Sequence, residues 1–235
     1  MQPMNNAAPW LSIIIPTLNE AAAIGSTLIG LQGLRAAGQE VIVVDGGSTD
    51  ATCRLAAPLV DQLVQGERGR ARQMNLGAAA ACGDVLLFLH ADTRLAQDAE
   101  TVIHSGLAQT GARWGRFDVR LSGSHPLLRV VETLMNLRSR LTGIATGDQA
   151  IFVRRDLFEQ AGGFPDIPLM EDIALSRILK RFSRPFCARE RVITSSRRWE
   201  QHGIVRTIFL MWRLRLDYAL GVKPEQLVRR YYSSP

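Results

Sequence analysis

The feature that most constrains the fold is an alternation of short β-branched runs and helical segments through roughly the first 110 residues. Apolar runs such as LSIII and EVIVV predict buried strands, at residues 11–15, 40–44, 60–65 and 84–89. Apolar residues at helical spacing predict helices between them, at 20–36, from Ser48 or Thr49 through Leu55, at 69–82 and at 97–109. This order indicates βαβ units and therefore an α/β fold around a mainly parallel sheet.

The second half of the chain is less regular. WGRFDVRL at 114–121 alternates as a strand does, and TGDQAIFVRRDLFEQAGGF is typical of a loop, a short strand, a turn and a helix. Helices are also predicted at 126–141, from Glu171, at 204–220 and at 224–232.

Three of the predicted strands end in polar residues. These segments are Pro16-Thr17-Leu18-Asn19-Glu20, Asp45-Gly46-Gly47-Ser48 and His90-Ala91-Asp92-Thr93. The carboxyl ends of parallel strands share one edge of a sheet, and ligands of open α/β folds bind at that edge. We therefore expect a ligand site built from these segments.

Two acids of this edge each have a functional and a structural interpretation. Asp45 can accept hydrogen bonds from a base or a ribose, with Gly46 and Gly47 leaving room for a ligand, or it is a turn acid or helix cap. Asp92 can bind Mg²⁺ or Mn²⁺ carrying a diphosphate, or cap the following helix. The spacing G-x-G-x-x-G is absent, which disfavours a dinucleotide-dependent dehydrogenase.

Further candidates lie elsewhere in the chain. Glu171 and Asp172, at a predicted helix start, include a candidate general base, or serve only the helix dipole. In SSRRWEQHG, the arginines can neutralise phosphate and Trp199 can stack on an acceptor or cover the core. His202 is a candidate metal ligand or a structural histidine. Arg70 and Arg72 either reach donor phosphates or are solvated.

Charge, cysteine content and hydropathy indicate which partners and which cellular compartment suit the chain. The net charge of +6 favours an anionic partner. Cys53, Cys82 and Cys187 are odd in number and far apart, so we expect reduced thiols in a cytosolic chain. No stretch of about 20 apolar residues occurs, so no membrane span is predicted. The arginines lack an interleaved aromatic pattern, which disfavours nucleic-acid binding.

Five motifs in order resemble the family 2 glycosyltransferases of the GT-A fold, particularly small stand-alone bacterial members. They are SIIIPTLNE, EVIVVDGGSTD, GRARQMNLGAAAACGDVLLFLHADT, GDQAIFVRRDLFEQAGGFPDIPLMEDIALSRIL and RRW. The resemblance implies a glycosyltransferase domain at 10–203. Outside it, we expect a disordered segment at 1–9 and a C-terminal helical extension at 204–235. The domain would comprise a nucleotide-binding half at 10–112 and an acceptor half at 113–203.

The resemblance also implies a role for each matching residue. The donor would be bound by Pro16, Thr17, Glu20, Asp45, Gly47, Arg72 and Asp92. Asp172 would be the catalytic base beside Glu171, and Asp92 would hold the metal, Mg²⁺ or Mn²⁺. Apart from the resemblance, His202 could complete that metal site. The acceptor side would include Gly147, Asp148, Gln149, Arg198 and Trp199.

The chain departs from the family pattern at two positions. His90 occupies the first acid position of the D-x-D motif, which leaves Asp92 as its carboxylate. Ser195 replaces the glutamine of the Q-x-x-R-W motif, which argues against a long-chain polymerase.

The expected reaction is inverting transfer from a nucleotide-diphospho-sugar, a UDP-sugar by resemblance, to a sugar, lipid-linked or small-molecule acceptor. Two alternatives remain open: a nucleotidyltransferase, although the chain lacks its Gly-rich loop and lysine, and a non-enzymatic membrane-binding protein. The membrane-binding alternative rests on the helix at 204–220, which could lie on anionic lipid at the inner membrane surface. Its apolar residues are Ile208, Phe209, Met211, Trp212, Leu214 and Leu216, and its basic residues are Arg206, Arg213 and Arg215. The same helix could instead pack on the domain or form a homodimer.

Overall fold

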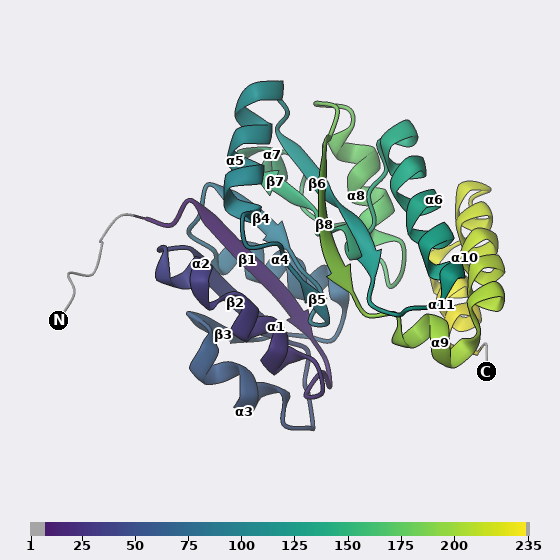
Figure 1. Ribbon diagram of the computed structural model, residues 1–235, viewed down its shortest axis with the longest axis horizontal. Coiled ribbons are helices and arrows are strands. Elements are labelled where there is room, and N and C mark those ends of the chain that lie inside the picture. The colour runs from purple at the N-terminus through teal and green to yellow at the C-terminus, as the bar shows by residue number, and fades with distance from the viewer. Residues whose placement is uncertain (1–7, 234–235) are drawn as a thin grey trace.

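The computed structural model describes residues 8–233, in which one eight-stranded sheet is flanked by helices (Figure 1). The strands are β1 Leu11–Thr17, β2 Glu40–Asp45, β3 Gln62–Gln65, β4 Val85–Phe88, β5 Thr93–Arg94, β6 Trp114–Leu121, β7 Phe152–Arg154 and β8 Phe186–Thr194. Their order is β3-β2-β1-β4-β7-β6-β8-β5. β7 is antiparallel to β4 and β6, and β5 is antiparallel to β8, whereas the other pairs are parallel. The predicted mainly parallel α/β sheet is confirmed.

The helices cover both faces of the sheet. They are α1 Ile24–Gly30, α2 Gln32–Ala36, α3 Thr52–Ala56, α4 Arg70–Ala80, α5 Ala99–Thr110, α6 Pro126–Thr142, α7 Arg155–Gln160, α8 Glu171–Leu179, α9 Arg197–His202, α10 Ile204–Ala219 and α11 Pro224–Ser233. Two short 3-10 helices, η1 Ala57–Leu59 and η2 Gly147–Gln149, complete the described elements.

Side chains of each strand alternate between two apolar layers, as a strand buried on both faces requires. Ile13 and Ile15 of β1 pack with α1, α2 and α5 on one face. Ile14 packs with α4, α7 and α8 on the other face. A side chain at Gly77 would collide with Ile14 and Val44, so this glycine lets α4 lie close to the sheet.

The C-terminal helices α10 and α11 lie beside α6 at the end of the molecule away from β3 (Figure 1). Leu214 and Leu227 are fully buried against Met170 and Ile173 around the start of α8. Residues of the predicted extension up to Tyr231 therefore share a core with the preceding domain. The domain boundary at 203/204 stays a prediction, and residues 1–7 of the segment expected to be disordered lie outside the described residues.

The faces of α10 differ from the lipid-facing arrangement expected from sequence. Leu214 is buried and Arg215 is half-buried, whereas Phe209, Trp212 and Leu216 are exposed. The helix thus has an inner face that packs on the domain and an outer apolar face. None of the helices within residues 8–233 combines the length and apolar character that a bilayer span requires.

Several local predictions are wrong. The segment 20–36 forms two helices that meet at Leu31, and α3 begins at Thr52, whose backbone N–H donates to Asp50 rather than to Ser48 or Thr49. No turn separates β7 from α7. Strands β5 and β8 and helix α9 were not predicted. The exposed charges at 189–191 interrupt the apolar pattern of β8, and β5 has only two residues.

Candidate active site

The polar segments after β1 and β2 are joined by hydrogen bonds. The backbone N–H of Asn19 donates to Ser48 Oγ at 2.8 Å, and the N–H of Thr49 donates to Asn19 Oδ1 at 2.9 Å. The N–H of Glu20 donates to Thr52 Oγ1 at 2.8 Å. Because β1 and β2 are parallel neighbours, both segments leave the same edge, as predicted.

Asp45 is buried at the end of β2. Its Oδ2 accepts the backbone N–H groups of Gly47 at 3.0 Å and Ser48 at 2.8 Å, and its Oδ1 accepts the Ser48 hydroxyl at 2.5 Å. Burial works against the charged form, but the hydrogen bonds from Ser48 and Gly47 outweigh it and lower the pKa of Asp45. The carboxylate therefore organises its own turn and remains ionised; Gly47, at φ +93°, is exposed beside it.

Asp92 lies beyond the end of β4 and does not cap a helix, because α5 begins only at Ala99. The preceding carbonyl of Ala91 accepts a hydrogen bond from Thr27 of α1 at 2.7 Å. The following Thr93 pairs with Thr194 at the end of β8. These contacts hold the turn in place and leave the half-buried Asp92 carboxylate for another role.

Glu20 is electrostatically close to Asp92. Burial, followed by the charge of Asp92, raises the pKa of the Glu20 carboxyl above its ordinary value. Arg197, at the start of α9, places its Nη2 3.9 Å from Glu20 Oε2 and partly offsets that repulsion. The ends of β1, β4 and β8 thus bring two acids and an arginine together.

A pocket beside this edge joins the HADT segment to α8. It is lined by Arg70, Met74, Phe88, His90, Gly147, Ile151, Phe164, Glu171 and Asp172. Asp172 Oδ2 accepts the backbone N–H of Gly147 at 2.9 Å, and its Oδ1 accepts the N–H of Ile173 at 2.7 Å. The predicted base is therefore held toward η2 and also stabilises the start of α8.

His90 and Glu171 add ionisable groups to the same pocket. His90 Nδ1 lies 3.3 Å from Asp148 Oδ1, while its buried Nε2 has no hydrogen-bond partner within residues 8–233. Glu171 is buried and lies 3.5 Å from Arg70. Burial and the neighbouring Asp172 raise the pKa of Glu171.

Strained backbone is concentrated in the loops of this site. Among the described residues, left-handed φ angles at non-glycine positions occur at Asn19, Ala150 and Met170. They lie in the β1 loop, directly after η2 and directly before Glu171. Such conformations cost of order 1–3 kcal/mol each and persist where the surrounding structure fixes them. Here they aim the polar segments into one region.

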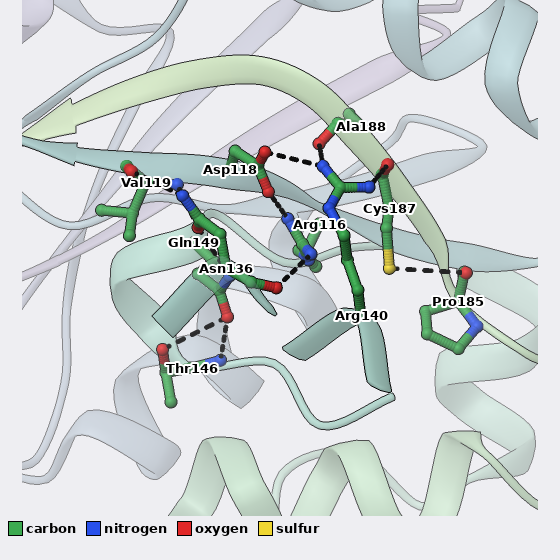
Figure 2. Close-up of polar contacts among 10 residues, drawn as sticks. All are labelled: Arg116, Asp118, Val119, Asn136, Arg140, Thr146, Gln149, Pro185, Cys187 and Ala188. Carbon is green, nitrogen blue, oxygen red and sulfur yellow. Dashed lines mark hydrogen bonds and ion pairs between the residues drawn. The ribbon is translucent and has the colours of Figure 1, made fainter. Parts of the chain in front are cut away.

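A polar network of side chains from β6 and α6 holds the η2 turn in place (Figure 2). Asn136 of α6 bonds both the N–H and the carbonyl of Val119, at 2.9 and 3.0 Å, and accepts from Gln149 Nε2 at 3.4 Å. Arg140 donates to Asp118 at 2.6 Å, and Arg116 pairs with the same carboxylate. Gln149 is fully buried in this network, so it positions Gly147 and Asp148 rather than facing solvent.

Other predicted site residues lie apart from this pocket or have structural contacts. Arg72 is exposed and pairs with Glu67 and Asp166, whereas Arg70 of the same helix faces Glu171. Arg198 stacks 3.6 Å from the ring centroid of Tyr231. Trp199 is half-buried against α6, and His202 is exposed. Pro16 and Thr17 lie in β1. Their proposed ligand contacts stay predictions.

The donor set at this edge suits a cation that takes most of its ligands from a diphosphate. Glu20 and Asp92 repel each other electrostatically, so a positive charge between them is favoured. Mg²⁺ often binds through one or two protein carboxylates together with phosphate oxygens. No group of three potential His, Cys, Asp or Glu ligands occurs in the described part of the chain, and His202 joins no such group.

A family model described as Glycosyl transferase family 2 matches residues 12–158, which contain the three polar segments, His90 and Gly147. The chain belongs to this family. A PGL/p-HBAD biosynthesis glycosyltransferase of Mycobacterium bovis (strain BCG / Pasteur 1173P2) is 42% identical over 103 residues. That match covers 41% of this chain and 40% of the relative, so the chain aligns with less than half of that protein.

Two solved structures share the fold of this chain over most of its length. The S. aureus TarS fragment 1–349 in complex with UDP-GlcNAc has a TM-score of 0.64 at 19% identity and covers 79% of this chain and 58% of its own. The mannosyltransferase PcManGT from Pyrobaculum calidifontis, in complex with GDP-Man and Mn²⁺, has a TM-score of 0.64 at 23% identity, with coverages of 89% and 61%. The expected GT-A fold is confirmed by these neighbours.

Proposed function

We propose that this protein is an inverting glycosyltransferase that moves a sugar from a UDP-sugar to an acceptor hydroxyl. The observation that carries the proposal is that one pocket is lined by His90 of the HADT segment, by Gly147 of η2 and by the two acids at the start of α8. Membership of the family supports the reaction class. The nucleotide complexes of TarS and PcManGT support a nucleotide-sugar donor.

The donor would bind across the ends of β1, β2 and β4. Asp45, ionised and surrounded by N–H donors, would accept a hydrogen bond from the base through its remaining lone pairs. Asp92, with Glu20 beside it, would hold Mg²⁺ or Mn²⁺. The cation would supply positive charge to the diphosphate as it leaves. Pro16, Thr17, Gly47 and Arg72 complete the proposed donor side.

Asp172 would act as the base. Its Oδ2 is held by the Gly147 N–H, so the carboxylate is fixed before an acceptor arrives. The acceptor oxygen bonds to the anomeric carbon from the face opposite the diphosphate, its proton passes to Asp172, and the bond between the sugar and the diphosphate breaks. Glu171, whose pKa is raised, would tune the charge beside it, and Asp148, Arg198 and Trp199 complete the proposed acceptor side.

We further propose that the outer faces of α6 and α10 contact an anionic membrane surface. Each helix carries an exposed apolar stripe at intervals of three or four residues. The stripes comprise Leu127, Val130, Leu134, Leu137 and Leu141 of α6, and Val205, Phe209, Trp212, Leu216 and Leu220 of α10. An apolar surface of this extent is unusual unless it binds something. The arginines Arg206 and Arg213 on α10 and the net charge of +6 favour anionic lipid as the partner.

Nucleoside-diphosphate release from a panel of UDP- and GDP-sugars tests the reaction. We expect wild type to release UDP slowly to water without an added acceptor. Asp172→Asn should reduce that rate about 10²–10⁴-fold, the usual effect of losing a general base. The same variant should bind UDP as wild type does. Full turnover by Asp172→Asn would exclude Asp172 as the base.

A further inference from the structure

Among the described residues, two arginines between α6 and α10 have no acidic partner within ion-pair distance. Arg138 Nε and Nη2 are buried and have no hydrogen-bond partner within residues 8–233. Arg215 is half-buried and forms no side-chain hydrogen bond or ion pair in that part of the chain. By contrast, Arg129 and Arg140 of α6 pair with Glu132 and Asp118, respectively.

The packing of the two helices explains why the charge of Arg215 acts on Arg138. Leu128, Val131 and Met135 of α6 pack with Ile204 and Ile208 of α10 in an apolar seam. One turn beyond Met135 on the same side of α6 lies Arg138. Arg215 lies two turns beyond Ile208 on α10, beside Leu214, which packs against α8. The seam therefore ends in two cations next to the start of α8.

This arrangement is electrostatically unfavourable for the protein alone. Burial, and then the charge of Arg215, lower the pKa of Arg138 to about 10, and Asp172 opposes the shift. Burial also lowers the pKa of Arg215, with Asp172 and Asp148 opposing. Arginine side chains are protonated at neutral pH, so two partly buried cations lie near the carboxylate of Asp172. Unpaired buried charge is costly and is retained mainly where it binds something.

We propose that Arg138 and Arg215 form a binding site for a phosphate group of the acceptor, next to Asp172. Two guanidinium groups provide several N–H donors in planar pairs, the geometry that binds phosphate oxygens. The phosphate would anchor the acceptor and help bring its hydroxyl to the base. This inference rests on the proposed transferase function. The phosphate could belong to a small phosphorylated acceptor or to a lipid-linked one on the membrane that α6 and α10 would contact.

Calorimetry with glycerol 3-phosphate tests the site, using protein saturated with UDP and Mg²⁺ so that the diphosphate position is filled. We expect glycerol 3-phosphate to bind and glycerol not to bind. Arg138→Met and Arg215→Met should each weaken binding about tenfold or more, since each removes a charge-assisted contact. Arg181→Met, an exposed arginine just beyond the end of α8 and away from its start, is the control and should bind as wild type does.

Unchanged binding by both arginine variants, or competition between glycerol 3-phosphate and UDP, would overturn the inference and leave the transferase proposal standing. If neither UDP nor GDP binds under any condition, the transferase proposal fails instead, and the same variants compared without nucleotide still test the arginine site.

The thermal stability of the variants separates binding from structural roles. Because the buried Nε and Nη2 atoms of Arg138 have no partner within residues 8–233, Arg138→Met should melt at or above the wild-type temperature while losing the probe. A lower melting temperature with unchanged probe binding would instead assign Arg138 a structural role. If Arg138→Met does not fold, Arg138→Lys, which keeps the charge and should keep part of the binding, carries the test with Arg215→Met.

Vesicles of phosphatidylcholine with and without phosphatidic acid distinguish the two sources of phosphate. A preference for phosphatidic acid that Arg138→Met and Arg215→Met abolish supports a phosphate presented on a lipid. Loss of glycerol 3-phosphate binding with an unchanged vesicle preference supports a small phosphorylated acceptor.

Discussion

At the scale of single residues, the close approach of Gly147 to His90 links the η2 turn to the HADT segment. A side chain at position 147 would collide with the His90 imidazole, including its Nε2 and Cε1 atoms. Only a residue without Cβ lets His90 reach Asp148 while Gly147 also donates to Asp172. The absence of a side chain at 147 is therefore a condition for the geometry of the proposed base.

Gly147→Ala should lower nucleoside-diphosphate release about 10–100-fold, because displacement of η2 moves the support of Asp172 by a fraction of an ångström or more. Gly33→Ala in α2 is the control. Nothing lies within 4 Å of a Cβ at position 33, so this variant should keep wild-type turnover and gain slightly in stability. Equal turnover by Gly147→Ala and wild type would show that η2 does not position the base.

Some residue roles could be predicted from the sequence because they depend on strand ends. Asp92 and Asp45 follow apolar runs, and the parallel order of those runs fixes their common edge. Arg138 and Arg215 could not be found in this way. Each lies in an ordinary amphipathic helix pattern. Only the packing of α6 on α10 shows that Arg138 has buried donor atoms without a partner within residues 8–233 and that Arg215 is half-buried nearby.

At the scale of elements, α6 is attached to β6 by side chains that replace a neighbouring strand. Asn136 satisfies both backbone groups of Val119 and supports Gln149 of η2 (Figure 2). The sequence does not predict this polar attachment, because the segment of α6 shows only a regular apolar repeat. It couples the stability of the fold to the position of the active-site turn.

Asn136→Ala should lower the free energy of unfolding by about 2 kcal/mol, because the buried N–H and carbonyl of Val119 lose their partner. Urea denaturation measures this change. Thr133→Ala on the same helix is the control, since its exposed hydroxyl bonds only the carbonyl of Arg129, and we expect a change within about 0.5 kcal/mol. A loss in Asn136→Ala no greater than in the control would contradict the structural role.

The exposed apolar stripes give the second prediction at this scale. Wild type should sediment with vesicles containing phosphatidylglycerol, and the double substitution Phe209→Ser and Trp212→Ser should weaken binding about tenfold or more, since two large side chains would no longer be buried in lipid. Ile29→Ser, equally exposed but on α1, should have no effect. Vesicle binding unaffected by the double substitution, or a dimer that forms through this face without vesicle binding, would contradict the membrane proposal.

Sequence prediction succeeded best for elements with an uninterrupted apolar pattern. β1, β2 and β6 match their expected ranges within two residues. β8 was missed because three exposed charged residues occupy its centre. Its pairing with β6, and with β5 at its end, makes it a strand. The division of segment 20–36 at Leu31 also depends on packing, since Leu31 is buried in the core beneath both helices.

At the scale of the whole molecule, the sheet and the C-terminal helices together enclose the proposed reaction. β1, β2 and β4 would present the donor, α8 and η2 the base, and α6 with α10 the acceptor phosphate and the membrane contact. The central claim is that the carboxyl edge of the sheet binds a metal–nucleoside diphosphate through Asp92. Every later step of the account depends on that binding.

Calorimetry with UDP, GDP and NAD, each with and without Mn²⁺, tests this claim most directly. We predict that UDP binds wild type in a Mn²⁺-dependent way, that Asp92→Ala weakens this binding and that NAD does not bind. Asp98→Ala, an exposed acid that makes no side-chain cap at the start of α5, is the control and should bind UDP as wild type does. A preference for GDP would keep the site and change the donor. Absence of nucleoside-diphosphate binding under every condition, or UDP binding that neither Mn²⁺ nor Asp92→Ala affects, would contradict the account.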